Sequence, residues 1–363
     1  MEYRCRIADQ LLRDKLEAMG AVLIEGPKAC GKTTTAEQQA KSIIYMDDPT
    51  KQLQYKQMAE TNISLLLEGE TPRLIDEWQE IPQFWDAIRF EVDHRDEDGQ
   101  FMLTGSAVPA ETDKIHHTGT GRYGWLTMRP MSLWESGEST GEISLADLFV
   151  APSKIGALNR LTLSKLSFIV CRGGWPKALQ KKTEKAALSQ ATEYYKAITN
   201  SDISRVDNVK RNAERAKRIM RSYARHQGSQ ASIATILADI STNEPENISD
   251  ETIDSYLTAL RKIFVIEDMP AWNPNLRSKT AVRTSDTRYY VDPSVGVAAL
   301  GLGPNDLIND LNTFGLFLKQ CVFEIFGFMP MRWMVLCFII GTKMGWNAML
   351  WYICVMAHMA LSK

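Results

Sequence analysis

The sequence predicts a protein of the α/β class: an N-terminal parallel sheet flanked by helices, then a helical region, then the start of an α+β domain. Three observations predict this. Short apolar runs alternate with amphipathic segments over residues 1–150, a glycine-rich segment directly follows the first strand-like run, and helical periodicity dominates after residue 186. At 363 residues the chain is long enough for two or three domains.

Short apolar runs predict the strands of the sheet. They read AVLIE, SIIYMDDP, RLIDE and GQFMLTGSA, and occupy residues 21–25, 42–49, 73–77 and 99–107. The segment IPQFWDAIRFEVDHR has the apolar spacing of a helix. Strands that alternate with helices form a parallel, doubly wound sheet, which binds its ligand at the carboxyl ends of the strands.

The segment GPKACGKT, residues 26–33, fits the pattern G-x-x-x-x-G-K-[ST] of a phosphate-binding loop, or P-loop. Its glycines let the backbone N–H groups turn inward toward phosphate oxygens. The pattern predicts a charge from Lys32 for the β and γ phosphates, a hydroxyl from Thr33 for Mg²⁺, and a helix whose N-terminal end faces the anion. The alternative is a glycine-rich turn without a ligand, which the flanking strand and helix disfavour.

We therefore predict ATP and Mg²⁺ as ligands of this loop. The residues predicted to contact the nucleotide are Gly26, Pro27, Lys28, Ala29, Cys30, Gly31, Lys32, Thr33 and Thr34. Cys30 is interpreted as a small filler residue without a catalytic role.

Two acids end the third apolar run, as a phosphate site requires. Asp76 is predicted to hold the Mg²⁺ with Thr33, and Glu77 to polarise the attacking water. The alternative is a strand that ends in two solvated acids. Thr104 and Ser106 end the fourth run, where Ser106 is predicted to sense the γ-phosphate; turn chemistry is the alternative for both.

Arg122, in TGTGRYGWL, is a candidate for stabilising charge on the departing phosphate. It could act in its own chain or in a neighbouring subunit, which leaves a homo-oligomer possible. The alternative is a turn arginine that pairs with a carboxylate.

Five segments in order make the sequence resemble a prokaryotic family of AAA-like P-loop ATPases with a C-terminal domain of unknown function. The segments are GAVLIEGPKACGKTTTA, RLIDEWQEIPQFWDAIR, FMLTGSA, GRYGWLTMRPMSLWE and CRGGWPKAL. The resemblance covers roughly residues 1–317. It implies a P-loop NTPase fold of AAA type with a glutamate-activated water, and it names no partner.

The resemblance supports the roles given to the site residues. These are Lys32 and Thr33 for phosphate and metal, Asp76 for metal, Glu77 for water, Ser106 for sensing, and Arg122 for charge. Trp78, Trp134 and Trp175 fall in the same segments, and we expect all three to pack in the core because tryptophan in a short motif is more often core than ligand.

The middle of the chain predicts a winged helix-turn-helix with a basic face. Eight Lys or Arg lie between Arg205 and Arg225, and a short helix, a turn, a second helix capped by Ser249 and an apolar strand follow. One interpretation places the second helix in the major groove of DNA. The other is a lid or protein-interaction module, favoured by Asp250, Glu251 and Asp254 in the first turn of that helix, which would repel phosphate.

These patterns divide the chain into five parts. They are an ATPase core at 1–150, a helical lid or linker at 151–211, a winged-helix-like domain at 212–275, the start of a C-terminal domain at 276–317 and a hydrophobic tail at 318–363. In the resembling family the C-terminal domain continues into a pattern like the restriction-endonuclease fold, and this chain departs from it at about Leu318.

The last 33 residues are rich in Met and Trp and contain no Asp or Glu. Their apolar runs are too short to span a membrane singly, and a buried core element is the second alternative. The third is translation out of frame. Met344–Met349 must be encoded as ATG GGN TGG AAY GCN ATG, and sliding the frame back one base gives a polar text with an Asn-Gly or Asp-Gly turn. We favour the frameshift, which truncates the C-terminal domain.

Composition indicates a soluble globular protein, because 24% of the residues are charged and the formal net charge is −2. No global basic excess points to nucleic acid. The six Cys lack metal-ligand spacing, and the N-terminus lacks an apolar signal region, so we expect reduced thiols and a cytoplasmic location without membrane attachment. The predicted function is an Mg²⁺-dependent ATPase that switches the winged helix through an unknown protein partner; the alternative is a nucleotide-gated DNA-binding regulator.

Overall fold

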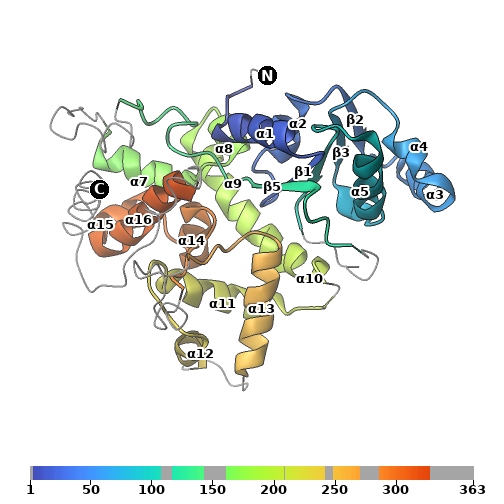
Figure 1. Ribbon diagram of the computed structural model, residues 1–363. Coiled ribbons are helices and arrows are strands. Elements are labelled where there is room, and N and C mark those ends of the chain that lie inside the picture. Colours follow the sequence, from blue (N-terminus) through green and yellow to red (C-terminus); the bar gives the residue numbers. More distant parts are fainter. Residues whose placement is uncertain are drawn as a thin grey trace, which may run out of the picture.

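In the computed structural model the chain forms a sheet-containing part and a helical part (Figure 1). The structure describes residues 3–107, 117–142, 161–207, 209–241, 248–269 and 286–327, and only the backbone for residues 322–327. The expected domain boundaries near residues 150 and 275 lie outside these ranges.

A parallel five-stranded sheet forms the core of the N-terminal part. Its order is β2-β3-β4-β1-β5, and every neighbouring pair is parallel. The strands are β1 (Ala21–Glu25), β2 (Ser42–Tyr45), β3 (Arg73–Asp76), β4 (Phe101–Gly105) and β5 (Tyr123–Thr127). The predicted fold class is confirmed. The edge strand β5 was not among the predicted runs, because its glycine and polar residues interrupt the apolar pattern.

Helices cover both faces of this sheet. They are α1 (Ile7–Ala18), α2 (Lys32–Glu37), α3 (Gln52–Asn62), α4 (Ser64–Leu67), the 3-10 turn η1 (Trp78–Glu80) and α5 (Phe84–Arg95). Side chains alternate across a strand, so Leu23 packs with Phe84 of α5 on one face, whereas Val22 and Ile24 pack with Leu12 of α1 on the other. The apolar run of β1 is therefore buried on both sides.

The helical part begins with α7 and ends with α16. Its first members are α7 (Leu163–Arg172), α8 (Pro176–Leu179), α9 (Glu184–Ala197), the π-helical turn η4 (Ile198–Asp202) and α10 (Ile203–Arg205). In Figure 1 α9 runs from beside the sheet toward α10 and α11. This segment therefore links the two parts of the molecule.

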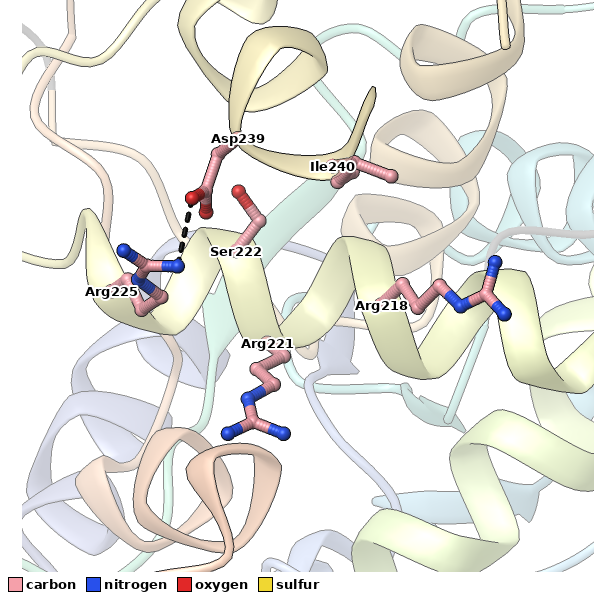
Figure 2. A pocket seen from close by; sticks show the side chains of 6 residues that line it. All are labelled: Arg218, Arg221, Ser222, Arg225, Asp239 and Ile240. Carbon is pink, nitrogen blue, oxygen red and sulfur yellow. Dashed lines mark ion pairs between the residues drawn. The ribbon is translucent and has the colours of Figure 1, made fainter. Parts of the chain in front are cut away.

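Three helices and two antiparallel bridges follow: α11 (Ala213–Arg225), α12 (Ile233–Ser241), α13 (Asp250–Lys262), and the bridges Ile266–Tyr290 and Met269–Thr287. The predicted cap of α13 is present, since the Ser249 hydroxyl accepts a hydrogen bond from the Thr252 N–H at 3.3 Å. Helices α11 and α12 are joined at the surface by an ion pair between Arg225 and Asp239 at 2.8 Å (Figure 2).

The described C-terminal segment consists of α14 (Pro293–Leu300), α15 (Pro304–Asn309) and α16 (Leu311–Gly327). Helix α14 directly follows the bridged residues Thr287 and Tyr290, and Asp292 caps it by accepting from the Ser294 N–H at 2.9 Å. Helix α16 crosses the expected boundary at 317/318 without a break, and Gln320 beyond it is fully buried.

Residues 328–363 of the hydrophobic tail lie outside the described residues, so the three interpretations of the tail stay predictions. Across the residues that are described, no helix combines the length and apolar character needed to cross a membrane.

Candidate nucleotide-binding site

The carboxyl edge of the sheet brings the predicted site residues together. Glu25 pairs in register with Gly105, and Asp76 with Thr104, on three adjacent strands. The loop after β1, the acids that end β3 and the hydroxyls that end β4 therefore meet at one edge. The sequence pattern predicted this arrangement, because strands of a parallel sheet end on the same side.

Backbone shape explains the glycines of the loop. Gly26 has φ 148°, and a Cβ there would lie 2.1 Å from the carbonyl oxygen of Met128. Gly31 has φ 104°, a left-handed conformation that is unfavourable for residues with a Cβ. Cys30 between them is fully buried in the apolar core below the loop, in agreement with its interpretation as a filler.

The ammonium group of Lys32 lies inside the curve of the loop. The side chain is buried, and Nζ donates hydrogen bonds to the carbonyl oxygens of Gly26 and Pro27 at 2.9 Å each. A buried cation that donates to neutral carbonyls attracts anions strongly, because those carbonyls carry no net charge to offset it. Thr34, next along, is exposed in the first turn of α2.

Thr33 and Asp76 meet where a metal ion would bind beside phosphates. The Thr33 hydroxyl donates to Oδ1 of Asp76 at 2.6 Å, and the Thr104 hydroxyl donates to the same oxygen. Burial raises the pKa of Asp76, and the two hydroxyl donors oppose that rise. A carboxylate and a hydroxyl are hard oxygen ligands that fit Mg²⁺, which keeps most of its shell for water and phosphate oxygens.

Glu77 points out of the strand because its backbone is left-handed, with φ 54°. Its Oε2 accepts a hydrogen bond from the Ser106 hydroxyl at 3.0 Å and another from Nε2 of Gln79. The sequence placed Glu77 and Ser106 at neighbouring strand ends, but it predicted neither their hydrogen bond nor the contribution of Gln79. The signal was available in the segment DEWQ, where an amide follows the acid by two residues.

Two segments of the chain match known protein families. Residues 19–136 match the AAA domain, and residues 163–306 match a domain of unknown function (DUF8612). Residues 19–136 therefore form an AAA-like P-loop ATPase domain. The matched AAA segment contains the phosphate loop, Asp76, Glu77 and Ser106, and the second match covers most of the helical part.

Solved structures similar to this ATPase include a Walker-type ATPase of Pyrococcus abyssi, at 14% identity and a TM-score of 0.47, covering 80% of this chain and 94% of that chain. Another is the ORC1 protein of Aeropyrum pernix in complex with DNA, at 14% identity and a TM-score of 0.27, covering 85% of this chain and 94% of that chain. No curated protein matched the sequence.

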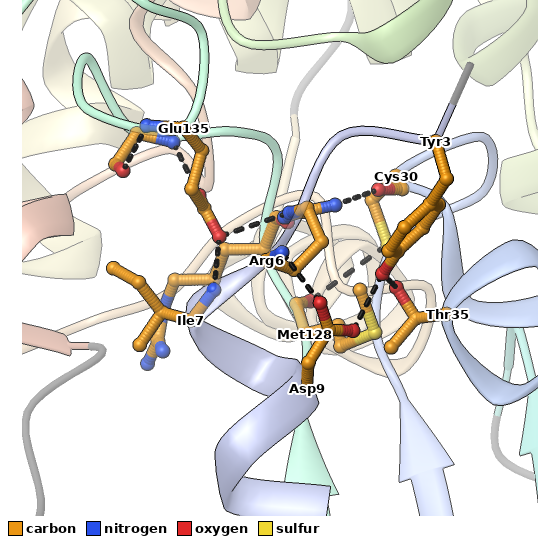
Figure 3. Close-up of polar contacts among 10 residues, drawn as sticks. Tyr3, Arg6, Ile7, Asp9, Cys30, Thr35, Met128 and Glu135 are labelled. Carbon is orange, nitrogen blue, oxygen red and sulfur yellow. Dashed lines mark hydrogen bonds and ion pairs between the residues drawn. The ribbon is translucent and has the colours of Figure 1, made fainter. Parts of the chain in front are cut away.

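The ATPase holds its phosphate loop with an arginine that sequence reasoning missed. Arg6 precedes α1 and is 4% exposed. Its guanidinium donates to the carbonyl oxygens of Cys30 and Arg129 at 2.8 Å each and pairs with Glu135 at 2.9 Å (Figure 3). The N-terminal segment is therefore tied to the loop and to the chain that follows β5. No local pattern reveals a contact of this kind.

Tyr3 adds a second tie from the same segment. Its hydroxyl donates to Oδ1 of Asp9 at 2.5 Å and lies 3.1 Å from the hydroxyl of Thr35 in α2 (Figure 3). Burial, followed by the bond to Asp9, raises the pKa of the Tyr3 phenol. The phenol stays neutral and fixes the start of α1 against the helix of the phosphate loop.

Arg122 lies away from the phosphate loop of its own chain. Its carbonyl oxygen accepts from the N–H of Ala21, the first residue of β1, so it sits at the amino edge of the sheet. The five-residue strand separates the two edges by about 13 Å. The guanidinium pairs with Asp93 at 2.7 Å, which is the alternative considered for a turn arginine. Action in a neighbouring subunit stays a prediction.

Two of the three motif tryptophans are core residues. Trp78 and Trp175 are each 3% exposed, as expected. Trp134 is 52% exposed, so the prediction of a packing role is wrong there. It follows β5 in a surface turn, where Gly137 N donates to its carbonyl oxygen.

Proposed function

We propose that this protein hydrolyses ATP with Mg²⁺ and uses the reaction to move the helical part relative to the sheet. The observation that carries the proposal is the meeting of Thr33, Asp76, Glu77 and Ser106 at one edge of the sheet, beside Lys32. Mg²⁺, when bound by Thr33 and Asp76, neutralises charge on the phosphate oxygens.

The protein's own groups supply the remaining roles. Lys32 offsets the charge of the β and γ phosphates, and Glu77 takes a proton from the attacking water as it approaches the γ-phosphate. The Ser106 hydroxyl, which now donates to Glu77, is placed to donate to a γ-phosphate oxygen instead. Such an exchange would free the Glu77 carboxylate only when a triphosphate is present.

Contacts with the helical part support a conformational role. Ala107, directly after Ser106, packs against the apolar cluster that contains Tyr223 and Leu257 of α11 and α13. The second loop glycine, Gly31, faces Pro176 at the start of α8. A Cβ added at Gly31 would lie 3.7 Å from the Cγ atom of Pro176. Both the sensing residue and the phosphate loop thus adjoin the helical part.

The test is ATP turnover by the full chain beside the Glu77→Gln variant. We expect Mg²⁺-dependent turnover that the variant loses while it still binds ATP. Equal turnover by both would remove the assigned role of Glu77. A rise in turnover when double-stranded DNA is added would favour coupling to DNA, and no change would favour a protein partner.

A second candidate function is nucleotide-gated DNA binding by the winged-helix-like domain. The order of three helices and an antiparallel bridged pair favours it, as do exposed Arg218 and Arg221 on α11. Against it, Figure 2 shows the arginines of α11 pointing in different directions, and Arg225 is paired with Asp239.

Acidic residues also form ion pairs with some of the basic residues between Arg205 and Arg225. Lys217 pairs with Glu214 at 2.7 Å, and Arg211 with Asp207 at the same distance. Reversing the charge of Arg218 and Arg221 together should abolish salt-dependent DNA affinity if this function is correct. Absence of any DNA affinity at low salt would end it.

A further inference from the structure

An ion pair joins the phosphate loop directly to the helical part. Nζ of Lys28 lies 2.8 Å from Oδ1 of Asp202, which stands 174 residues later in the chain. The Lys28 side chain is 48% exposed and that of Asp202 is 14% exposed. The cation therefore reaches out of the loop to a carboxylate that the helical part holds in place.

Asp202 ends the π-helical turn η4, whose neighbours are deeply buried. Ile198, Ile203 and Val206 are each at most 5% exposed and belong to the same apolar cluster as Tyr223 and Leu257. Any displacement of η4 must therefore displace α11 and α13 as well, because a packed core does not deform continuously. Single π-helical turns are frequent at functional sites.

A nucleotide in the loop would compete with Asp202 for Lys28. A triphosphate brings several negative charges against the single charge of a carboxylate, and Lys28 lies four residues before Lys32 in the same loop. Several charge-assisted bonds from lysine to phosphate are stronger than a single lysine-carboxylate pair whose lysine is half exposed, because water and salt screen such a pair. Binding of the phosphates therefore weakens the hold on Asp202.

We propose that the Lys28–Asp202 pair is a latch that ties η4 to the phosphate loop and opens when a nucleoside triphosphate binds. This rests on the proposed function, since it names the contact through which nucleotide reaches the helical part. With the latch closed, η4 and the helices packed on it are held against the loop. With it open, they are free to move.

Two measurements on the full chain test the latch without relying on hydrolysis. The first is hydrogen exchange of residues 198–206 with and without Mg²⁺ and AMP-PNP, a triphosphate analogue that resists hydrolysis. The second is AMP-PNP affinity. The key variant is Asp202→Asn, which keeps the side-chain shape, and Glu193→Gln is the matched control because it breaks the exposed Lys196–Glu193 pair on α9.

Nucleotide should raise exchange of residues 198–206 in the wild type. Asp202→Asn should show raised exchange already without nucleotide and bind AMP-PNP about two- to five-fold more tightly, the range expected for loss of one partly exposed ion pair. Glu193→Gln should match the wild type. Lys28→Gln should also raise exchange without nucleotide, which shows that the pair is responsible.

The latch requires both results. Unchanged exchange in the wild type on binding, or an Asp202→Asn affinity equal to that of Glu193→Gln, overturns it. ATP turnover is measured separately on the same samples. A wild type that binds AMP-PNP and opens residues 198–206 but never turns over ATP overturns the proposed hydrolysis and leaves the latch intact.

Discussion

The hydroxyl of Thr33 lies 2.6 Å from a carboxylate oxygen of Asp76, although 43 residues separate them in the chain. The pair joins the end of the phosphate loop to the end of β3, across the edge where β1 and β3 both terminate. Because Thr104 donates to the same oxygen, one buried carboxylate organises three segments of the site. Its chemistry leads to the first prediction.

Asp76→Asn should lower Mg²⁺-dependent turnover by about a hundred-fold or more, because the metal loses its only charged protein ligand in the described site. The same change should stabilise the metal-free protein. Burial raises the pKa of Asp76, so its contribution to the free energy of unfolding is greatest at acidic pH and is lost as pH rises through the raised pKa.

The stability part of this prediction is tested by measuring melting temperatures in EDTA between pH 4 and pH 8. The melting temperature of Asp76→Asn should rise relative to that of the wild type as pH increases. A constant difference across the range would show that folding does not raise the pKa of Asp76.

Lys32→Ala should reduce ATP affinity by at least about a hundred-fold, since a buried charge that bonds phosphate is removed. Fluorescent-nucleotide titration measures the effect. Lys196→Ala, on the exposed face of α9, is the control and should bind as the wild type does. Retained affinity in the Lys32 variant would mean that backbone N–H groups alone hold the phosphates.

Glu77→Gln should bind ATP normally and lower turnover by about 10²–10⁴-fold, the usual contribution of a general base. Single-turnover kinetics separate this effect from product release. Ser106→Ala should also slow turnover, but by less, because it removes a donor and leaves the carboxylate in place. A larger loss from Ser106→Ala than from Glu77→Gln would reverse the two assignments.

Arg6→Ala should destabilise the protein by about 3–5 kcal/mol, because it leaves Glu135 buried without its partner. Urea unfolding measures this. The double variant Arg6→Met, Glu135→Gln removes the unpaired charge and keeps an acceptor for the N–H groups of Ile7 and Ser132. It should recover much of the loss in stability but bind ATP more weakly than the wild type, since the carbonyl of Cys30 loses its donor. Normal ATP affinity in the double variant would show that Arg6 serves stability alone.

Arg122→Ala should leave the ATP affinity of the chain unchanged, because Arg122 lies at the opposite edge of the sheet. Its predicted role in a neighbouring subunit has a direct assay. Mixing Arg122→Ala with Lys32→Ala should restore turnover that neither has alone, since one supplies the site and the other the arginine. No restoration would leave Arg122 as the surface partner of Asp93.

The features that depend on a few adjacent residues could be predicted from the sequence. The apolar run AVLIE followed by GPKACGKT predicted β1 and the phosphate loop, and RLIDE predicted β3 with Asp76 and Glu77 at its end. These follow because strand periodicity, glycine backbone freedom and strand direction are properties of a few adjacent residues. The parallel order then placed both acids beside the loop.

The distant groups that meet around that site could not be predicted from the sequence. Arg6 reaches the carbonyl of Cys30 across 24 residues, and Asp202 reaches Lys28 across 174. The tertiary structure also put Arg122 at the amino edge and left Trp134 at the surface. Such contacts depend on how whole helices pack onto the sheet, and packing is set by the summed burial of many side chains, which no short segment records.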